Sequence, residues 1–433
     1  MAQKLTDLHL ADLHARAAQL GVPRFRLLRR EDLVREIEAR GGGVAGGGES
    51  PEGDDAGERR REVAPARDDR ADEAEGGRER ERLEPDETEE VTGLLEIMPQ
   101  RFGFVRLEGL EEKPGDVYIS AAQVRRCELR SGDQVSGPAR SPRRAERHRA
   151  LVHVDSVNGV EPQSERPRFD DLTAVMPKRR VALDHDPADV LTRAVDLLAP
   201  VALGQRVLIR AAPRSGRTTL LRGLARAIGA VEEIGVVVLL IDERPEEATA
   251  WREALPDAEI ASATADLAPA DQVRVADFAL ERSRRRVEAG EDVVLLVDSL
   301  SRLAVAAGDV TEVKRLFGSG RETAEEDAGS LTVIATVLDG NDDGGAAERA
   351  VITTESSLIR LDPTLAASGV VPALVPSECL VSNEEMLRPA KELASARGLR
   401  WLLADLDPVD AASQLRQRIE GSASNAELLA SLG

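Results

Sequence analysis

A stretch near the middle of the chain has the residue types of a phosphate-binding loop. Ala211–Thr219 reads Ala-Ala-Pro-Arg-Ser-Gly-Arg-Thr-Thr, and it lies between an apolar run at Val207–Ile209 and a helical stretch at Leu220–Ile228. It matches the P-loop pattern G-x-x-x-x-G-K-[ST] with two departures, because Ala211 replaces the first Gly and Arg217 replaces the Lys. Arginine is cationic but bulkier and forked, so it does not simply take the place of Lys between two phosphates.

The rest of this loop keeps the chemistry of phosphate binding. Gly216 would let backbone N–H groups surround the phosphates, and the helix N-terminus would supply positive potential. Thr218 could reach Mg²⁺ with its hydroxyl group. The segment therefore favours a nucleotide site that also holds Mg²⁺. The alternative is an ordinary strand–turn–helix corner without a ligand.

Two acidic residues come directly after other apolar runs. Asp298 follows Val293–Val297, where a carboxylate can hold Mg²⁺ through water. Glu243 follows Val236–Ile241, where a carboxylate can orient and activate an attacking water. Each residue alone could be a helix cap or a surface acid. Together, at the carboxyl ends of neighbouring strands, they indicate a site for phosphoryl transfer.

A second group of residues is typical of nucleic-acid binding. Arg101–Arg106 reads Arg-Phe-Gly-Phe-Val-Arg, which puts Phe102, Phe104 and Arg106 on one face of a strand, and Tyr118 comes from a neighbouring run. Aromatic rings flanked by arginines stack bases of single-stranded RNA, at about 1–3 kcal/mol per base. The arginines that could follow a phosphate backbone are Arg143, Arg144, Arg147 and Arg149. Two Phe on one strand face are otherwise core residues, and the arginines favour RNA binding over that alternative.

The composition sets limits on the whole molecule. The chain has 433 residues, 58 Lys+Arg, 79 Asp+Glu and a formal net charge of −21, a length that predicts two to four domains at roughly 100–200 residues each. The longest apolar run is far shorter than the roughly 20 residues that span a bilayer, and the N-terminus lacks the apolar stretch of a secretory signal. Only two cysteines, Cys127 and Cys379, are present, which excludes a disulfide framework. We expect a soluble, cytoplasmic protein that does not contact a membrane.

The composition changes along the chain and divides it into four segments. Residues 1–40 have apolar residues at helical spacing and predict a small helical module. Residues 41–90 carry 18 acidic against 8 basic residues and almost no large apolar side chain, which indicates a flexible acidic linker. Residues 91–160 contain several short β-type runs separated by Gly, Pro and charged turns, which suggests a small barrel. Residues 161–433 alternate apolar, β-branched runs with helical stretches, which predicts an α/β domain around a parallel sheet.

These residues together resemble the bacterial transcription termination factor Rho family, whose members are ring-forming, RNA-dependent ATPases and helicases. The most specific markers are Leu240–Glu247, which reads Leu-Ile-Asp-Glu-Arg-Pro-Glu-Glu, and Leu296–Leu303, which reads Leu-Val-Asp-Ser-Leu-Ser-Arg-Leu. Gly204–Arg206 and Phe102–Arg106 are further markers, and only the linker is unmatched. The resemblance implies a multidomain protein with a small N-terminal helical module, an OB-fold, cold-shock-like β-barrel and a RecA-like α/β P-loop ATPase domain with C-terminal helices.

The resemblance also implies a role for individual residues. Glu243 would be the catalytic carboxylate, Asp298 with Thr218 would hold the Mg²⁺ that accompanies ATP, and Arg302 would link the ATP and RNA sites. The ATP pocket would be formed by Ala202, Leu203, Gly204, Gln205, Arg206, Val207, Arg214, Ser215, Gly216, Arg217, Thr218, Thr219 and Arg244. The primary RNA site would be formed by Arg101, Phe102, Gly103, Phe104, Val105, Arg106, Asp116, Val117, Tyr118, Glu146, Arg147 and His148. The implied partners are single-stranded RNA, further copies of the chain in a hexameric ring, and RNA polymerase.

The chain departs from the family pattern in the motor domain. The family's second RNA loop, a Gly-rich insertion, is absent, since only Val305–Val313 separates the Arg-Leu-Ala segment from Lys314. The central-channel Lys-Gly-Thr-Gly motif is replaced near Ile352–Ser356. The Arg-rich stretch that supplies the family's trans-acting finger reads Asp362–Gly369 and contains no Arg, which leaves Arg360 as the nearest candidate. An arginine finger contributes about 10³–10⁵ in rate, so its loss is expected to be severe.

Three hypotheses follow for the function. The first is a Rho-type termination factor that binds nascent RNA and uses RNA-dependent ATP hydrolysis to translocate and release the transcript. The second is a Rho-like regulatory paralogue that binds RNA and nucleotide with weak or no ATPase and helicase activity, as the missing loops and finger suggest. The third, a RecA-like motor unrelated to RNA, does not explain the aromatic and arginine residues. The complete set of Glu243, Arg244, Asp298 and Arg302 favours the first.

Overall fold

The computed structural model describes residues 34, 35, 37, 88–143, 146–162, 165–339 and 343–432. The chain divides into two units, Met1–Arg80 and Glu81–Gly433. In the first unit Val34, Arg35 and Ile37 are helical. The rest of the predicted helical module and nearly all of the predicted linker lie outside the described residues. The first strand begins at Thr88, just inside the segment predicted as linker.

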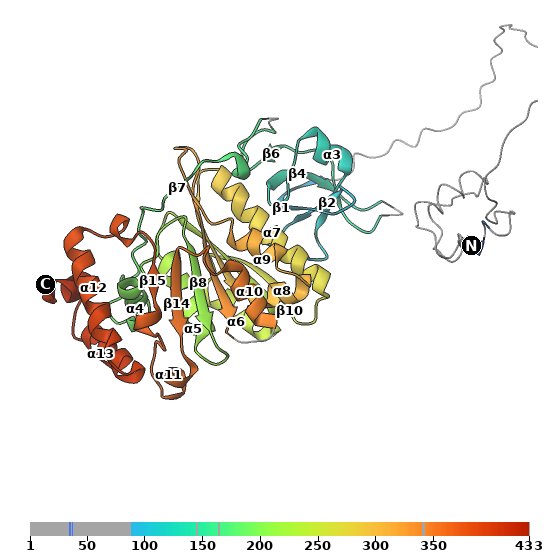
Figure 1. Cartoon of the computed structure of the whole chain (residues 1–433). Helices are drawn as coiled ribbons and strands as arrows, with labels where there is room; N and C mark the ends of the chain where they lie inside the picture. The colour runs from blue at the N-terminus through green and yellow to red at the C-terminus, as the bar shows by residue number, and fades with distance from the viewer. Residues whose placement is uncertain are drawn as a thin grey trace, which may run out of the picture. The chain divides into compact units, whose positions relative to one another are not determined.

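The beginning of the second unit is a small closed barrel (Figure 1). Its strands pair in the ring order β1-β2-β3-β5-β4, and β4 returns to β1. Its core consists of fully buried β-branched and leucine side chains such as Leu95, Val105 and Val135, which alternate with outward residues along each strand. The elements are β1 (Thr88–Ile97), β2 (Gly103–Arg106), β3 (Val117–Ile119), α3 (Ala121–Arg126), β4 (Gln134–Arg140), β5 (Ala150–Leu151) and β6 (Ser156–Val157). The predicted barrel is therefore confirmed.

The larger part of the second unit is an α/β domain with a seven-stranded sheet. The strand order is β10-β9-β11-β13-β8-β14-β15, and all neighbours are parallel except β14 and β15. The strands are β8 (Arg206–Ala211), β9 (Ile234–Glu243), β10 (Glu259–Thr264), β11 (Asp292–Asp298), β13 (Leu331–Leu338), β14 (Ser357–Leu361) and β15 (Leu380–Val381). Their continuous apolar sequences bury both faces, as parallel sheets require. This confirms the predicted α/β fold.

Helices cover both faces of this sheet (Figure 1). One core cluster joins α4, α5, α6 and the C-terminal helices to alternate strand residues, and the second joins α7, α8, α9 and α10 to the other residues. The helices are α4 (Val190–Leu198), α5 (Arg217–Gly229), α6 (Pro245–Ala254), α7 (Pro269–Glu288), α8 (Leu300–Ala307), α9 (Thr311–Phe317), α10 (Asp343–Val351), α11 (Pro363–Ala367), α12 (Ala390–Ala404), α13 (Pro408–Glu420) and α14 (Asn425–Ser431). The minor elements are β7 (Ala174–Val175), β12 (Glu322–Thr323) and the 3₁₀ turns Phe169–Asp171, Pro376–Glu378 and Glu384–Met386.

A buried arginine ties the C-terminal helices to the sheet domain. Arg193 of α4 is fully buried, and its guanidinium donates to the carbonyl oxygens of Ile419 and Ser422, each at 3.0 Å. It also donates to Oδ1 of Asn425 at 3.2 Å. The carbonyl of Ile419 also accepts from the N–H of Ser422, so Arg193 adds hydrogen bonds to the turn that ends α13.

The barrel and the α/β domain are joined by ion pairs to α7, the longest described helix. Arg274 of α7 contacts the carboxylate of Glu96 in β1. Glu288 at the other end of α7 pairs with Arg130 of the barrel at 2.9 Å. The backbone N–H of Phe169, on the segment that connects the two domains, also donates to Glu288 at 2.7 Å. In the described part of the chain, no helix is long and apolar enough to cross a membrane.

Candidate nucleotide and RNA sites

The turn between β8 and α5 has the backbone shape of a phosphate-binding loop. Gly216 precedes α5 with a φ of 86°, and no atom lies within 4 Å of where its Cβ would be, so the backbone angle and not crowding calls for glycine. Oγ of Ser215 donates to the carbonyl oxygen of Ala212 at 2.7 Å and closes the turn. The first N–H groups of α5 have no partners within the helix, so the turn offers them to an anion.

Two carboxylates lie beside this turn at the ends of β9 and β11. Glu243 is 9% exposed and Asp298 is 1% exposed. The hydroxyl of Thr336, on β13, donates to Oδ1 of Asp298 at 3.1 Å. Among the described residues, Oδ2 of Asp298 is buried without a hydrogen-bond partner. A free carboxylate oxygen next to a phosphate-binding turn fits Mg²⁺, which in such sites takes one or two carboxylates and completes its shell with phosphate oxygens and water.

Arg217, the residue that replaces the P-loop lysine, is bound by these acids. Its Nε lies 3.0 Å from Oδ1 of Asp298, and its Nη2 lies 3.6 Å from Oε1 of Glu243. The side chain is only 12% exposed. Its guanidinium therefore offsets charge on both carboxylates, and a phosphate or Mg²⁺ ligand would compete with this pairing.

A second arginine holds Glu243 from the other side. The guanidinium of Arg302, on α8, contacts the Glu243 carboxylate and donates to the carbonyl oxygen of Ile241 at 3.3 Å. The α8 helix begins at the cap formed by Ser299, whose Oγ accepts from the N–H of Arg302 at 3.3 Å. The ends of two strands, β9 and β11, and the starts of two helices, α5 and α8, thus bring together the predicted residues Glu243, Asp298, Arg217 and Arg302.

Thr336 is a member of this cluster that the sequence did not reveal. It lies in β13 between Ala335 and Val337 and is completely buried. Its only signal was one of two threonine hydroxyls in an otherwise apolar strand. Thr218, the predicted second Mg²⁺ residue, lies in the first turn of α5 and is half-buried.

Other predicted nucleotide residues are less tightly placed. Arg244 precedes α6 at the end of β9 and is exposed, and in the described part of the chain its side chain forms no ion pair. Arg214 and Thr219 are also exposed, and Arg214 has a φ of 65° within the turn. Arg360, the nearest candidate for a finger, pairs with Asp339 at 2.5 Å and with Glu378 at 3.6 Å. Its side chain is therefore engaged within its own chain.

The segment Ala202–Val207 does not reach the P-loop within this chain, and its predicted role in the ATP pocket stays a prediction. The N–H of Gly204 donates to Oγ1 of Thr332 at 2.8 Å, and a Cβ on Gly204 would lie 2.2 Å from the backbone nitrogen of Glu322. These partners lie at the N-terminal edge of the sheet. The P-loop follows the opposite end of β8, a strand that spans about 20 Å.

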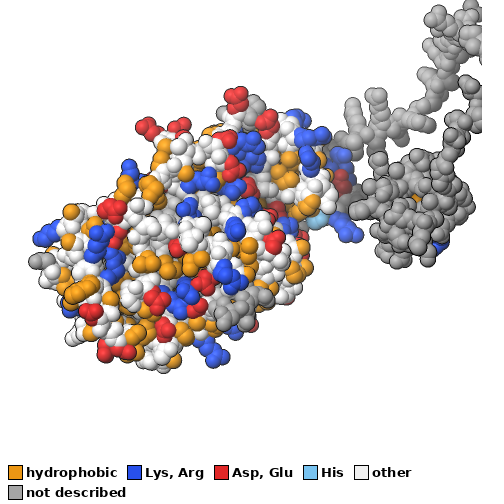
Figure 2. All heavy atoms as spheres, in the orientation of Figure 1, with side chains coloured by type: hydrophobic (Ala, Val, Ile, Leu, Met, Phe, Trp, Pro, Cys, Tyr) orange, Lys and Arg blue, Asp and Glu red, His pale blue; other side chains and the backbone are white. Residues whose placement is uncertain are grey.

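The aromatic residues of the barrel form one surface cluster, which we call the platform. The ring of Tyr118 lies 5.6 Å from that of Phe102 and 6.1 Å from that of Phe104, and His148 lies 5.0 Å from Phe104. Phe102, Phe104 and Tyr118 are half-buried and His148 is exposed, so ring surface remains accessible to bases. The intervening Val105 faces the barrel core instead. Figure 2 shows basic side chains gathered over this part of the molecule.

Arg106 and Asp116 lie beneath the platform and not on it, and their predicted contact with RNA stays a prediction. Both are 2% exposed. The Arg106 guanidinium donates to Asp116 at 2.7 Å and to Glu96 at 2.9 Å, and it lies 5.4 Å from the ring centre of Phe104. The loop between β2 and β3 covers this arginine, because the N–H groups of Leu107 and Lys113 both donate to Asp116. These residues support the platform.

The remaining predicted RNA residues lie at the rim of the barrel. Glu146 accepts two hydrogen bonds from Arg140, at 2.6 and 2.7 Å, and these lower the pKa of its carboxyl to about 2. Arg147 is exposed beside His148. Arg149 pairs with Glu89 at 2.8 Å, and Arg144 lies outside the described residues. Gly103 sits where β1 and β2 approach closely, since a Cβ there would lie 2.7 Å from the carbonyl oxygen of Glu96.

The chain joins an oligonucleotide-binding type of barrel, with an exposed aromatic platform, to a P-loop α/β domain. This combination defines a nucleic-acid-dependent ATPase. Residues 91–163 match the Rho termination factor RNA-binding domain, and residues 192–317 match the nucleotide-binding domain of the ATP synthase alpha/beta family. The chain belongs to the transcription termination factor Rho family. It is 38% identical to that factor of Rhodopirellula baltica, over 78% of this chain and 71% of the relative.

Other comparisons agree with this assignment. The Rho factor of Aquifex aeolicus is 36% identical over 78% of this chain and 84% of its own length, and that of Bacillus subtilis is 36% identical over 78% and 83%. Among solved structures, an ATPase from the type III secretion system of pathogenic bacteria aligns with a TM-score of 0.50 at 22% identity. That alignment covers 65% of this chain and 94% of the other, and it shows a shared fold.

The platform geometry predicts the effect of removing its rings. We expect Phe102→Ala and Phe104→Ala each to weaken binding of cytidine-rich single-stranded RNA at least tenfold, because a stacked base contributes about 1–3 kcal/mol. Thermal unfolding should change little, since both rings are half-exposed. Fluorescence anisotropy and a melting curve on the same samples check this. If the barrel unfolds in either variant, the rings are core residues and not an RNA-binding surface.

The buried network predicts a different result for Arg106. We expect Arg106→Ala to destabilise the barrel by about 3–5 kcal/mol, because two buried carboxylates lose their shared cation. Denaturant unfolding measures this loss. The matched control is Arg101→Ala, which removes an exposed arginine from the adjacent turn and should leave stability unchanged. Wild-type stability combined with lost RNA affinity in Arg106→Ala would mean that Arg106 contacts RNA directly.

Proposed function

We propose that this chain is a Rho-type transcription termination factor that binds nascent single-stranded RNA on the platform and uses RNA-dependent ATP hydrolysis to translocate and release the transcript. The observation that carries the proposal is the pair of buried carboxylates, Glu243 and Asp298, beside a phosphate-binding turn in a chain that also bears the platform. An acid pair of this kind has no structural need, since apolar residues would fill strand ends at lower cost.

The residues of the site divide the work of phosphoryl transfer. The turn at Gly216 and the start of α5 would bind the phosphates of ATP. Asp298 and Thr218 would hold Mg²⁺, which when bound supplies charge neutralisation to the phosphate oxygens. Glu243 would orient the attacking water and accept its proton, and its contact with Arg302 fixes the carboxylate for that task.

We infer that the working form is a homo-oligomeric ring, with a hexamer as the expected size, acting on RNA polymerase in the cytoplasm. The support is that one chain does not complete its own site. Arg360 is engaged by Asp339 and Glu378, so the cation that would stabilise the transition state has to come from elsewhere. Ala202–Val207 lies a strand length from the P-loop of its own chain, where a neighbouring subunit could use it.

A second function is favoured by the shortened loops. Helix α8 ends at Gly308, whose φ of 74° closes the helix, and α9 begins at Thr311. The turn at Ile352–Ser356 between α10 and β14 is similarly short. Because both connections are so short, the α/β domain offers few contacts to RNA at these two positions. The alternative is therefore a Rho-like regulatory paralogue that binds RNA and nucleotide with weak or no ATPase and helicase activity.

ATP turnover decides between the two functions. We expect the purified chain to hydrolyse ATP with Mg²⁺, to do so faster with cytidine-rich single-stranded RNA, and to lose at least 10²-fold in turnover in Glu243→Gln, which removes the base but keeps the side-chain shape. The matched control is Glu246→Gln, at an exposed position of α6, and this variant should stay active. RNA binding without any turnover in the wild type would favour the regulatory paralogue.

The position of Arg217 makes a separate prediction about nucleotide affinity. We expect Arg217→Lys to bind ATP with Mg²⁺ about tenfold more tightly, since a single ammonium cannot bridge both carboxylates and one charge-assisted interaction no longer opposes the ligand. Titration with a fluorescent ATP analogue, with and without Mg²⁺, measures this. Arg226→Lys, at an exposed position in the last turn of α5, serves as control. Weaker binding in Arg217→Lys would show that Arg217 already serves the phosphates.

A further inference from the structure

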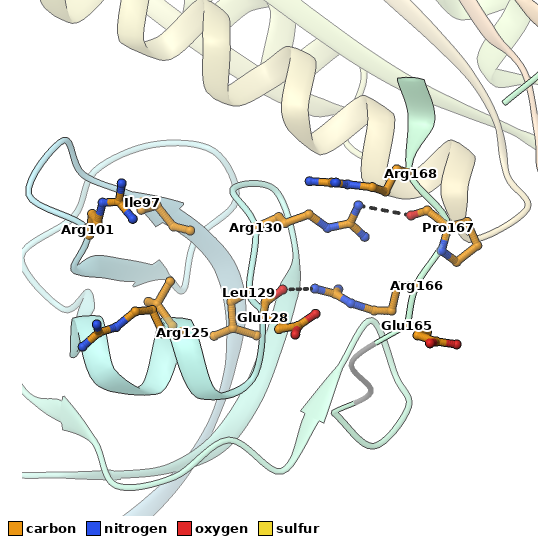
Figure 3. A pocket seen from close by; sticks show the side chains of 11 residues that line it. Ile97, Arg101, Arg125, Glu128, Leu129, Arg130, Glu165, Arg166, Pro167 and Arg168 are labelled. Atoms are coloured by element: carbon orange, nitrogen blue, oxygen red, sulfur yellow. Dashed lines mark hydrogen bonds between the residues drawn. The ribbon is translucent and has the colours of Figure 1, made fainter. Parts of the chain in front are cut away.

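A cavity of about 780 Å³ lies where the barrel meets the segment that connects it to the α/β domain (Figure 3). We call it the junction pocket. Its side chains come from the β1–β2 turn, from α3 and the turn after it, and from residues 165–168. Five of them are arginines: Arg101, Arg125, Arg130, Arg166 and Arg168. Only two acids, Glu128 and Glu165, line it, and Figure 3 shows Glu165 extending in the opposite direction to Arg166.

Two of the arginines are fixed by the fold. Arg130 donates to the carbonyl oxygen of Pro167 at 3.1 Å and pairs with Glu288 of α7 at 2.9 Å. Burial and the nearby Arg285 lower the pKa of Arg130, and it still remains charged at neutral pH. Arg166 pairs with Asp133 at 2.8 Å and donates to the carbonyl oxygen of Glu128 at 2.6 Å. The pocket wall is therefore ordered before any ligand arrives.

The other three arginines are available to a ligand. Arg101, Arg125 and Arg168 are exposed, and among the described residues none of them forms an ion pair or hydrogen bond through its guanidinium group. In the described part of the chain most arginines pair with a carboxylate, as Arg106 does with Glu96 and Arg302 does with Glu243. Three unpaired guanidinium groups around one hollow leave a positive site for phosphate oxygens, which arginine binds in a bidentate manner.

The junction pocket is continuous with the platform through one tight turn. The N–H of Met98 donates to the carbonyl oxygen of Phe102 at 2.8 Å, and the N–H of Arg101 donates to that of Met98 at 2.8 Å. Arg101 has a φ of 69° at this turn. As a result, Phe102 contributes its ring to the platform, whereas the adjacent Arg101 lines the pocket. Consecutive residues are about 3.8 Å apart, well within one nucleotide of chain.

We propose that the junction pocket binds the phosphodiester backbone of the same RNA strand whose bases stack on the platform. The proposal rests on the RNA-binding function proposed above. The width of the hollow and the spread of its arginines over three segments suit several phosphates in a row and not one compact anion. The pocket borders Glu288 of α7 through Arg130, so RNA held there lies at the junction between barrel and motor.

The test compares two double charge reversals in the full-length chain. Arg125→Glu/Arg168→Glu alters the pocket, and Arg226→Glu/Arg397→Glu makes the same charge change at exposed positions of the α/β domain. Binding of a cytidine dinucleotide and of a cytidine-rich RNA of about 16 nucleotides, the upper site size of an OB fold, is measured at several salt concentrations. We expect the pocket variant to bind the longer RNA at least tenfold more weakly, with a salt slope reduced by about 1.4 for two phosphates.

The dinucleotide should bind the pocket variant as it binds the wild type, because the platform is intact. Equal losses in both double variants, or an unchanged salt slope in the pocket variant, would overturn the proposal. A melting temperature that tripolyphosphate raises in the wild type but not in the pocket variant, with RNA binding unchanged, would reassign the pocket to a small polyphosphate. Failure of the wild type to bind either RNA would contradict the proposed function itself. If the double variant does not fold, Arg125→Gln alone is expected to reduce the salt slope by about 0.7.

Discussion

A buried carboxylate must be paired with a cation, and both sites of this chain depend on that constraint. In the barrel, Arg106 neutralises Glu96 and Asp116 below the platform. At the nucleotide site, Arg217 lies against both Asp298 and Glu243. Leaving such a charge unpaired costs several kcal/mol, about 3–5 when one partner is removed. The buried acids therefore help to fix the platform rings above Arg106. They also help to fix the phosphate-binding turn beside Arg217.

The choice of arginine over lysine determines how the two acids of the nucleotide site are paired. A lysine ammonium is one compact charge, whereas the planar guanidinium of Arg217 can face two carboxylates at once. It lies against Oδ1 of Asp298 and Oε1 of Glu243. A phosphate that bound this guanidinium would compete with both carboxylates, and the free energy of the existing pairing would be subtracted from that of the new one. The substitution therefore changes what a ligand must compete with while it leaves the acids in place.

Much of this arrangement could be predicted from the sequence, because buried parallel strands read as continuous apolar runs and the acids that end them meet at one edge of the sheet. The rest depends on contacts between distant segments. Arg106 alternates with Phe104 on one strand face, and only the covering loop that carries Asp116 makes it internal. Ala202–Val207 is close to the P-loop in sequence but lies at the other end of β8. Thr336 shows no pattern until β13 is placed beside β11.

The connection between α8 and α9, from Gly308 to Thr311, is short. A motor moves its ligand only if its contacts with that ligand differ between nucleotide states. In this chain the stacking surface and the arginine-lined hollow both belong to the barrel, whose described links to the α/β domain include the ion pairs of Arg274 with Glu96 and of Arg130 with Glu288. Both pairs end on α7, which packs on the strands that carry Glu243 and Asp298. Helix α7 therefore links the barrel to both acids within one chain, alongside the contacts that Glu111 of the barrel makes with Arg252 of α6 and Ser262 of β10.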